Sequence, residues 1–160
     1  MPKRTLAAAV FLSVFFVFRI QAANVSFLVI ETGLSFEAGA NQHSELWESG
    51  LFDVFFEAGH IASNAPVLRI EANPKGEFPQ EALDDLKEAT DGGAEYFIIV
   101  LLDYDASQSP QAISLQLFRI DPYEKIFEQH YTGRAFSSTR EEYDNLKVVI
   151  QGVVPYLNNR

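Results

Sequence analysis

Carboxylates stand directly after several apolar runs of this 160-residue chain. Ligands of open α/β sheets bind outside the carboxyl ends of the parallel strands. Clustered carboxylate oxygens there suit Ca²⁺ or Mg²⁺, and a close carboxylate pair can act as general acid and base. This pattern predicts a ligand or divalent-cation site, with hydrolysis as one reaction it would support. Its residues are Glu31, Glu71, Asp103 and Asp105.

The opposing interpretation of these carboxylates is that strands end where charged residues begin. The chain holds 22 acidic residues, so several of them must follow apolar runs in any case. Their spacing also lacks the regular oxygen ligands of a calcium-binding loop. Both interpretations therefore stay open at the level of the sequence.

Sequence motifs of catalysis are missing elsewhere in the chain. It has no cysteine, which excludes thiolate zinc sites, disulfides and a cysteine nucleophile. His43, His60 and His130 show no metal-binding spacing, and no G-x-S-x-G elbow, G-x-G-x-x-G turn or P-loop occurs. We therefore expect a protein that is not an enzyme and needs no cofactor.

Aromatic residues crowd one predicted helix, residues 43–58. Most of its apolar residues recur on a single stripe, as in a helix with one buried face. Phe52 and Phe56 fall partly off that stripe, and Trp47 adds a third large aromatic group. An exposed aromatic patch suits a protein partner, so we predict Trp47, Phe52 and Phe56 as interaction residues. A wide helix face buried against a sheet is the alternative explanation.

The charge balance restricts the partner class. Acidic residues outnumber basic ones by 22 to 12, giving a formal net charge of −10. Nucleic-acid binding needs Lys and Arg to displace counterions from phosphates, and anionic membrane surfaces also attract basic segments. We therefore expect a protein partner, with no nucleic acid and no direct membrane insertion.

The amino-terminal segment has the three-part plan of a secretory signal peptide. Lys3 and Arg4 precede an apolar run over Leu6–Phe18, and small residues follow at Ala22 and Ala23. The run is too short to span a bilayer. An uncleaved anchor or a buried amino-terminal helix is the other interpretation of this segment.

Signal peptidases require a small side chain before the cut, and both Ala22 and Ala23 meet this need. We predict that residues 1–23 are a signal peptide and that residues 24–160 form the exported domain. The protein is then periplasmic or secreted.

Hydrophobic patterning predicts eight elements in the remaining chain. Unbroken apolar runs indicate strands buried on both faces, and alternation of apolar with polar residues indicates a half-solvated antiparallel strand. Period-3.6 stripes closed by Gly or Pro indicate helices. In chain order we predict strand 25–30, helix 43–58, strand 66–72, helix 79–90, strands 96–102, 112–120 and 126–133, and helix 139–157.

This element order predicts a mixed α/β fold in one domain of two or three layers. Two right-handed crossovers make the first three strands parallel, and the last two strands append an antiparallel hairpin. The result is a mixed five-stranded sheet in the order strand, helix, strand, helix, strand, strand, strand, helix. The position of the second strand relative to the first stays open.

The segment 89–99, ATDGGAEYFII, ends a helix in a Gly-containing turn before a hydrophobic strand. Together with the hairpin over 113–133 and the final helix, it resembles the periplasmic TolB N-terminal-like and CsgG-like α/β domains, a group that includes penicillin-binding-protein activators. The resemblance implies a non-catalytic module of the cell envelope that docks other proteins. The chain departs from that pattern in lacking a lipidation cysteine.

Overall fold

A computed structural model describes residues 22–33, 42–71, 78–104, 109–133 and 136–157. The predicted signal peptide therefore lies almost wholly outside the described residues, which begin at Ala22. The elements in chain order are β1 (Asn24–Thr32), α1 (Gln42–Glu57), β2 (Ile61–Asn64), β3 (Leu68–Ile70), α2 (Gln80–Asp91), β4 (Tyr96–Asp103), β5 (Ala112–Arg119), β6 (Glu124–Thr132), α3 (Thr139–Gln151) and α4 (Val154–Leu157).

The strands form one mixed sheet, which confirms the predicted fold class. Its order is β2-β1-β4-β5-β6, and β3 pairs with β1 beyond the end of β2. The pairings of β1 with β2, β3 and β4 are parallel, whereas those of β4 with β5 and β5 with β6 are antiparallel. The sheet order also settles the question that the sequence left open, because β1 lies inside the sheet with β2 and β3 on one side and β4 on the other.

The predicted second strand, residues 66–72, is wrong in its bounds. The structure instead has two short strands, β2 over Ile61–Asn64 and β3 over Leu68–Ile70, so the sheet has six strands instead of five. Pro66 lies between them, and proline cannot donate to a ladder. No sequence pattern predicted β2, because it is a short, mostly exposed edge strand without the unbroken apolar run that marks a buried strand.

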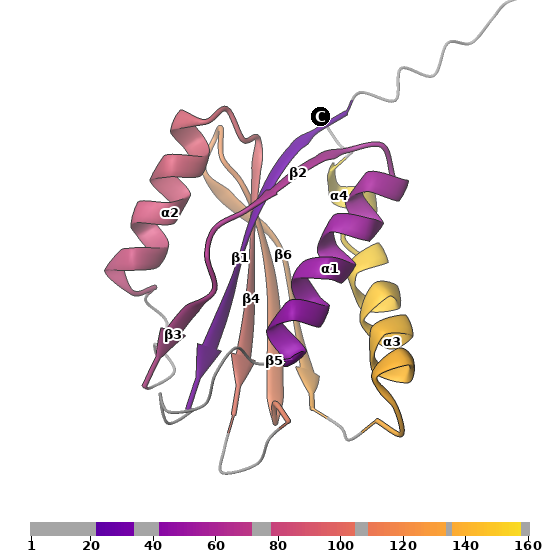
Figure 1. Ribbon diagram of the computed structural model, residues 1–160. Coiled ribbons are helices and arrows are strands. Elements are labelled where there is room, and N and C mark those ends of the chain that lie inside the picture. Colours follow the sequence, from indigo (N-terminus) through magenta and orange to yellow (C-terminus); the bar gives the residue numbers. More distant parts are fainter. Residues whose placement is uncertain (1–21, 34–41, 72–77, 105–108, 134–135, 158–160) are drawn as a thin grey trace, which may run out of the picture.

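Helices cover the two faces of the sheet unequally, in three layers (Figure 1). Helix α2 packs on one face, and α1, α3 and α4 pack on the other. Side chains of β1 alternate between the layers, with Phe27 and Val29 in the α1 core and Leu28 and Ile30 in the α2 core. An unbroken apolar run is therefore what a strand in the middle of this sheet requires.

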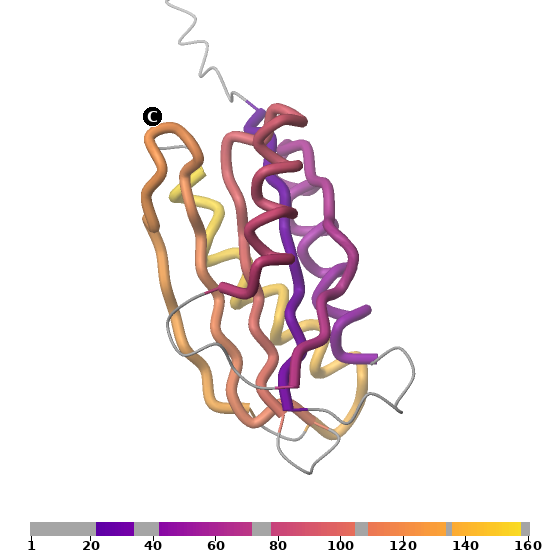
Figure 2. Tube along the Cα trace, turned by 90° about the vertical axis from the view of Figure 1, so that its left-hand side faces the viewer, coloured from indigo at the N-terminus to yellow at the C-terminus, as the bar shows by residue number. Residues whose placement is uncertain are grey.

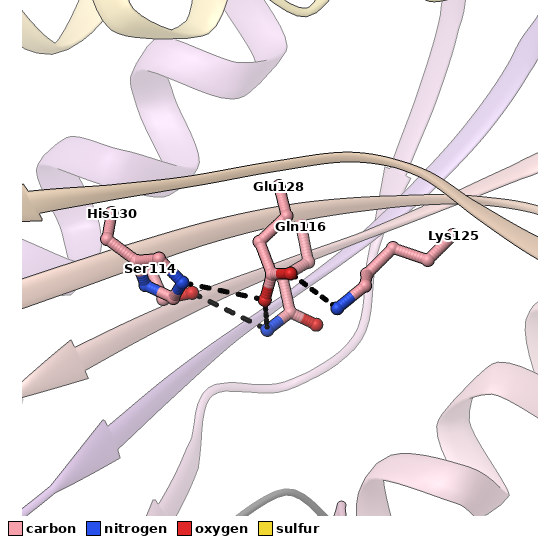
Figure 3. Close-up of polar contacts among 5 residues, drawn as sticks. All are labelled: Ser114, Gln116, Lys125, Glu128 and His130. Atoms are coloured by element: carbon pink, nitrogen blue, oxygen red, sulfur yellow. Dashed lines mark hydrogen bonds and ion pairs between the residues drawn. The ribbon is translucent and has the colours of Figure 1, made fainter.

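In the described chain, no helix covers β5 and β6 on the α2 side of the sheet (Figure 2). Polar side chains occupy this open face (Figure 3). Gln116 Nε2 donates to Glu128 Oε1 at 3.0 Å, and Lys125 Nζ donates to Glu128 Oε2 at 2.5 Å. Ser114 and His130 complete the group. These side chains satisfy one another, which explains the polar half of the alternation in β5.

Two glycines in the left-handed region offer a matched test of backbone packing. Gly33 has φ +80°, and an added Cβ would lie 2.0 Å from the Tyr104 carbonyl oxygen. Gly59 has φ +81°, and no atom lies within 4 Å of its added Cβ. Gly59→Ala should cost about 1–2 kcal/mol through its backbone conformation. Gly33→Ala should cost about 1–3 kcal/mol more through the clash. Urea unfolding measures both, and equal losses would contradict the close approach at Gly33.

A buried histidine links the end of α1 to the start of β1. His60 is 5% exposed, and its Nδ1 accepts a hydrogen bond of 3.2 Å from the Ala23 N–H. Burial lowers the pKa of His60 from its ordinary value of 6.5, because the charged imidazolium loses hydration.

This lowered pKa predicts a pH-dependent part of stability. Below pH 6.5 the unfolded chain binds more protons at this position than the folded chain does. The contribution of His60 to the free energy of unfolding is therefore complete above pH 6.5 and decreases as the pH falls from there. Urea unfolding should show that the free energy of unfolding decreases less between pH 7.5 and pH 5 in His60→Gln than in the wild type. A loss of stability in His60→Gln as large as that in the wild type would refute the assignment.

Candidate functional site

A buried ionic cluster lies at the carboxyl end of β1. Glu31 is 1% exposed, and its Oε2 accepts a hydrogen bond of 2.7 Å from Arg69 Nε. Its Oε1 accepts a hydrogen bond from the hydroxyl of Ser44, in the first turn of α1. Arg69 stands opposite Glu31 in the β1–β3 ladder. A buried carboxylate is costly without such partners, so the Glu31 cluster (Glu31, Ser44 and Arg69) joins β1, β3 and α1.

Asp103 ends β4 beside this cluster but faces the other way. It stands opposite Thr32 in the β1–β4 ladder, and Thr32 Oγ1 donates to Asp103 Oδ1 at 2.6 Å. Successive side chains of a strand point to opposite faces of a sheet. Because Glu31 points to the α1 side, Thr32 and Asp103 lie on the α2 side. Glu31 and Asp103 therefore do not form a carboxylate pair.

Of the other two predicted ligand residues, the structure describes only Glu71. Glu71 follows β3 and is exposed, and Asp105 lies outside the described residues. Within the described ranges no three His, Asp or Glu side chains are placed to hold a metal ion. In the structure, Glu31 accepts hydrogen bonds from Arg69 and Ser44, and Asp103 accepts one from Thr32.

Further polar residues gather near the Glu31 cluster on the α1 side of the sheet. His43 Nδ1 contacts Glu142 Oε1 of α3, and the His43 ring lies 6.3 Å from the ring of Tyr104. Tyr104 is 4% exposed, and its hydroxyl has no hydrogen-bond partner among the described atoms. Burial raises the pKa of Tyr104, and the nearby carboxylates Glu31 and Glu142 add to the shift.

Sequence reasoning missed Ser44, Arg69, Tyr104 and Glu142 as members of this region. Only the position of Glu31, after an apolar run, signalled polar chemistry there. Arg69 faces Glu31 through the register of two parallel strands, and His43 meets Glu142 across 99 residues of sequence. Neither proximity leaves a pattern in the sequence.

The three predicted aromatic interaction residues occupy different environments. Trp47 is 3% exposed and belongs to the core, so it is not part of an exposed aromatic patch. Phe52 is 36% exposed, and its ring packs edge-on against Phe27 with centroids 4.9 Å apart. Phe56 is 82% exposed. We call Phe52 and Phe56, which lie one turn apart on α1, the α1 aromatic surface.

Acidic side chains frame the α1 aromatic surface. Toward β2, Glu48 accepts a hydrogen bond of 2.7 Å from Asn64 Nδ2. Toward α3, Glu57 accepts one of 2.8 Å from Lys147 Nζ, and Asp53 accepts one from the Tyr143 hydroxyl. These contacts fix α1 between β2 and α3, so the exposed Phe56 lies on a helix that is held in place.

The edge strand β2 lies next to this helix. The amides of Ile61 and Ala65 donate to the carbonyls of Ala23 and Phe27, at 3.0 and 2.9 Å. Backbone groups alternate in direction along a parallel ladder, so those of Ala62 and Asn64 face away from β1. No described strand pairs with this outer side of β2. The edge can therefore accept a further strand.

A groove of about 430 Å³ runs on the α2 side of the same edge. Ile61 of β2, 63% exposed, lines it together with Asp85 and Glu88 of α2. Burial raises the pKa of Asp85, and the charges of Glu88 and Asp84 raise it further. The β2 edge thus lies between an aromatic helix surface and an acidic groove.

The fold and this edge define a class: a mixed α/β domain with an open edge strand. A family model described as "Uncharacterised protein" matches residues 25–121. That match spans more than half of the chain, and the chain belongs to this family. A search of curated proteins found no match. In the described part of the chain, no helix has both the length and the apolar character needed to cross a membrane.

Three of the solved structures with similar chains share 12–14% sequence identity with this one. The PelC dodecamer of Paraburkholderia phytofirmans has 12% identity and a TM-score of 0.48, over 87% of this chain and 89% of that chain. Protein XCC0632 of Xanthomonas campestris has 14% identity and a TM-score of 0.44, over 87% of this chain and 85% of that chain. The hypothetical protein CT253 of Chlamydia trachomatis has 14% identity and a TM-score of 0.36, over 84% of this chain and 93% of that chain. None of the three carries the TolB, CsgG or penicillin-binding-protein-activator name, so that resemblance stays a prediction.

The Glu31 cluster predicts unequal costs for removing two arginines. Arg69→Met leaves a buried carboxylate without its cation and should lower the free energy of unfolding by about 3 kcal/mol. Arg140→Met removes an ion pair with Asp144 whose side chains are 91% and 69% exposed, and should cost less than about 1 kcal/mol. Urea unfolding of both variants measures the difference. Similar small costs would show that Arg69 does not compensate Glu31.

Proposed function

We propose that the chain is an exported, non-catalytic protein-interaction module of the bacterial cell envelope, acting as a periplasmic assembly or accessory factor. Its partner protein docks at the β2 edge and on the α1 aromatic surface. The observation that carries this proposal is the 82% exposure of Phe56 on α1, a helix that contacts the open edge strand β2. When a partner covers a large apolar side chain that was exposed to water, the free energy of binding becomes more favourable.

The charge of the docking surface favours a partner with basic residues around an apolar contact. Glu48, Asp53 and Glu57 border the two Phe residues, and Asp85 and Glu88 line the groove on the other face of the sheet. The whole chain carries a net charge of −10. Complementary charge at the rim of an interface speeds association and selects among partners.

The open side of β2 supplies the second means of recognition. An extended partner segment can pair with the outward backbone groups of Ala62 and Asn64, as in strand addition. Its alternate side chains would then meet Phe56 on the α1 side and the Ile61 groove on the α2 side. The proposed occupant is therefore an extended segment in which apolar and basic residues mix.

Export rests on the predicted signal peptide and on the resemblance to periplasmic TolB-like domains. The alternative function, binding of a small ligand or divalent cation with hydrolysis as one outcome, has less support. Glu31 is already neutralised by Arg69, and Asp103 points to the other face of the sheet.

Replacement of Phe56 should weaken partner binding without unfolding the domain. Photo-crosslinking capture from the native cell envelope, with the full-length chain as bait, should recover a partner peptide that contains Lys or Arg and attaches at α1 or β2. Phe56→Ser should weaken its binding about tenfold or more, as loss of a buried aromatic anchor does. Trp47 is unsuitable for this test because its loss would disturb the core.

Val148→Ser on α3 is the matched control, since Val148 is also exposed, at 66%. It should bind as the wild type does. Equal capture by both variants, or crosslinks that map to α3, would refute docking at the α1 aromatic surface. Raising the salt concentration should slow association if the acidic rim contributes.

A further inference from the structure

The start of β1 distinguishes two neighbouring alanines. Ala22 is exposed, whereas Ala23 is only 1% exposed. Both backbone groups of Ala23 are engaged: its N–H donates to His60 Nδ1 at 3.2 Å, and its carbonyl accepts from the Ile61 N–H at 3.0 Å. Among the described residues, Ala23 is thus the first whose N–H and carbonyl are both hydrogen-bonded within the fold.

These contacts distinguish between the two possible signal-peptidase cuts, after Ala22 and after Ala23. A cut after Ala23 would remove the donor to a buried imidazole and the acceptor that begins the β1–β2 pairing. Buried polar groups left without partners destabilise the folded state. A cut after Ala22 keeps both hydrogen bonds and removes only residues that precede them. The folded domain therefore requires Ala23.

His60 is suited to hold a free amino group. Burial lowers the pKa of His60, which keeps the ring neutral at neutral pH. A neutral ring with an accepting Nδ1 carries its hydrogen on Nε2. An amino group at Ala23 could therefore replace the present peptide N–H as donor, without repulsion between two cations.

We propose that a signal peptidase hydrolyses the peptide bond between Ala22 and Ala23, and that the new α-amino group of Ala23 then binds His60 Nδ1. This proposal rests on the proposed export. Water is the second reactant: the C–N bond breaks, the hydroxyl joins the carbonyl carbon of Ala22, and the hydrogen joins the nitrogen of Ala23. Because Ala23 is buried in the domain, the cut precedes folding, when the bond is still accessible.

Intact mass spectrometry of the exported protein tests the position of the cut. The full-length chain is expressed in a Gram-negative host, and the periplasmic extract is analysed. We expect the mass of residues 23–160. A mass of residues 24–160, or of any other cut product, would overturn this inference and leave export standing. Recovery of only the uncut chain from the cytoplasm would overturn both the inference and the proposed export.

Two matched variants test the cut without depending on the fold. Ala22→Leu places a large side chain directly before the proposed cut and should lower the yield of the processed chain at least tenfold. Ala23→Leu places the same side chain after it and should still be processed. The reverse pattern would place the cut after Ala23 and refute the proposal.

The anchoring role of His60 has its own spectroscopic readout. ¹⁵N NMR of the processed protein should show neutral His60 with hydrogen on Nε2 and an accepting Nδ1 at pH 7. The Nδ1–H tautomer would refute the bond from the Ala23 amino group, even if the cut lies where we place it. His130, 70% exposed, serves as the internal reference.

Discussion

The parallel pairing of β1 with three other strands is the constraint on which the rest of the structure depends. Strand β1 carries β2 and β3 on one side and β4 on the other, and nearly all its side chains are buried. A strand so placed must satisfy every backbone group in ladders and bury side chains on both faces. Helices must therefore cover both faces around it, which gives the three layers. Its carboxyl end also brings Glu31 into the interior, where Arg69 and Ser44 compensate the charge.

The same arrangement explains why the two sheet edges differ. At the β6 edge, polar side chains on the open face bind one another across β5 and β6. At the β2 edge, the strand is short, Pro66 interrupts it, and an exposed Phe56 lies on the adjoining helix. Short and interrupted strands limit uncontrolled edge-to-edge pairing. Such an edge remains available to a partner that brings matching side chains, which is the basis of the proposed function.

Several elements could be predicted because their signals are local. The run Tyr96–Leu102 predicted a central strand, and β4 occupies almost the same residues. The alternation in Ala112–Ile120 predicted β5 and its polar face. The prediction failed at β2, where an exposed edge strand needs no apolar residues. It also grouped the buried Trp47 with Phe52 and Phe56 as interaction residues. Spacing along a helix does not reveal how wide a face the neighbouring helix and sheet cover.

The sequence by itself determined the fold class, the parallel and antiparallel parts of the sheet and the acidic character of the surface. These follow from hydrophobic period, element order and charge, which are properties of residues near one another in the chain. Only the tertiary structure decided that Glu31 meets Arg69, that Asp103 faces the opposite side, and that His60 holds Ala23. Such contacts depend on strand order and register, which juxtapose residues tens of positions apart and leave no periodic trace in the sequence.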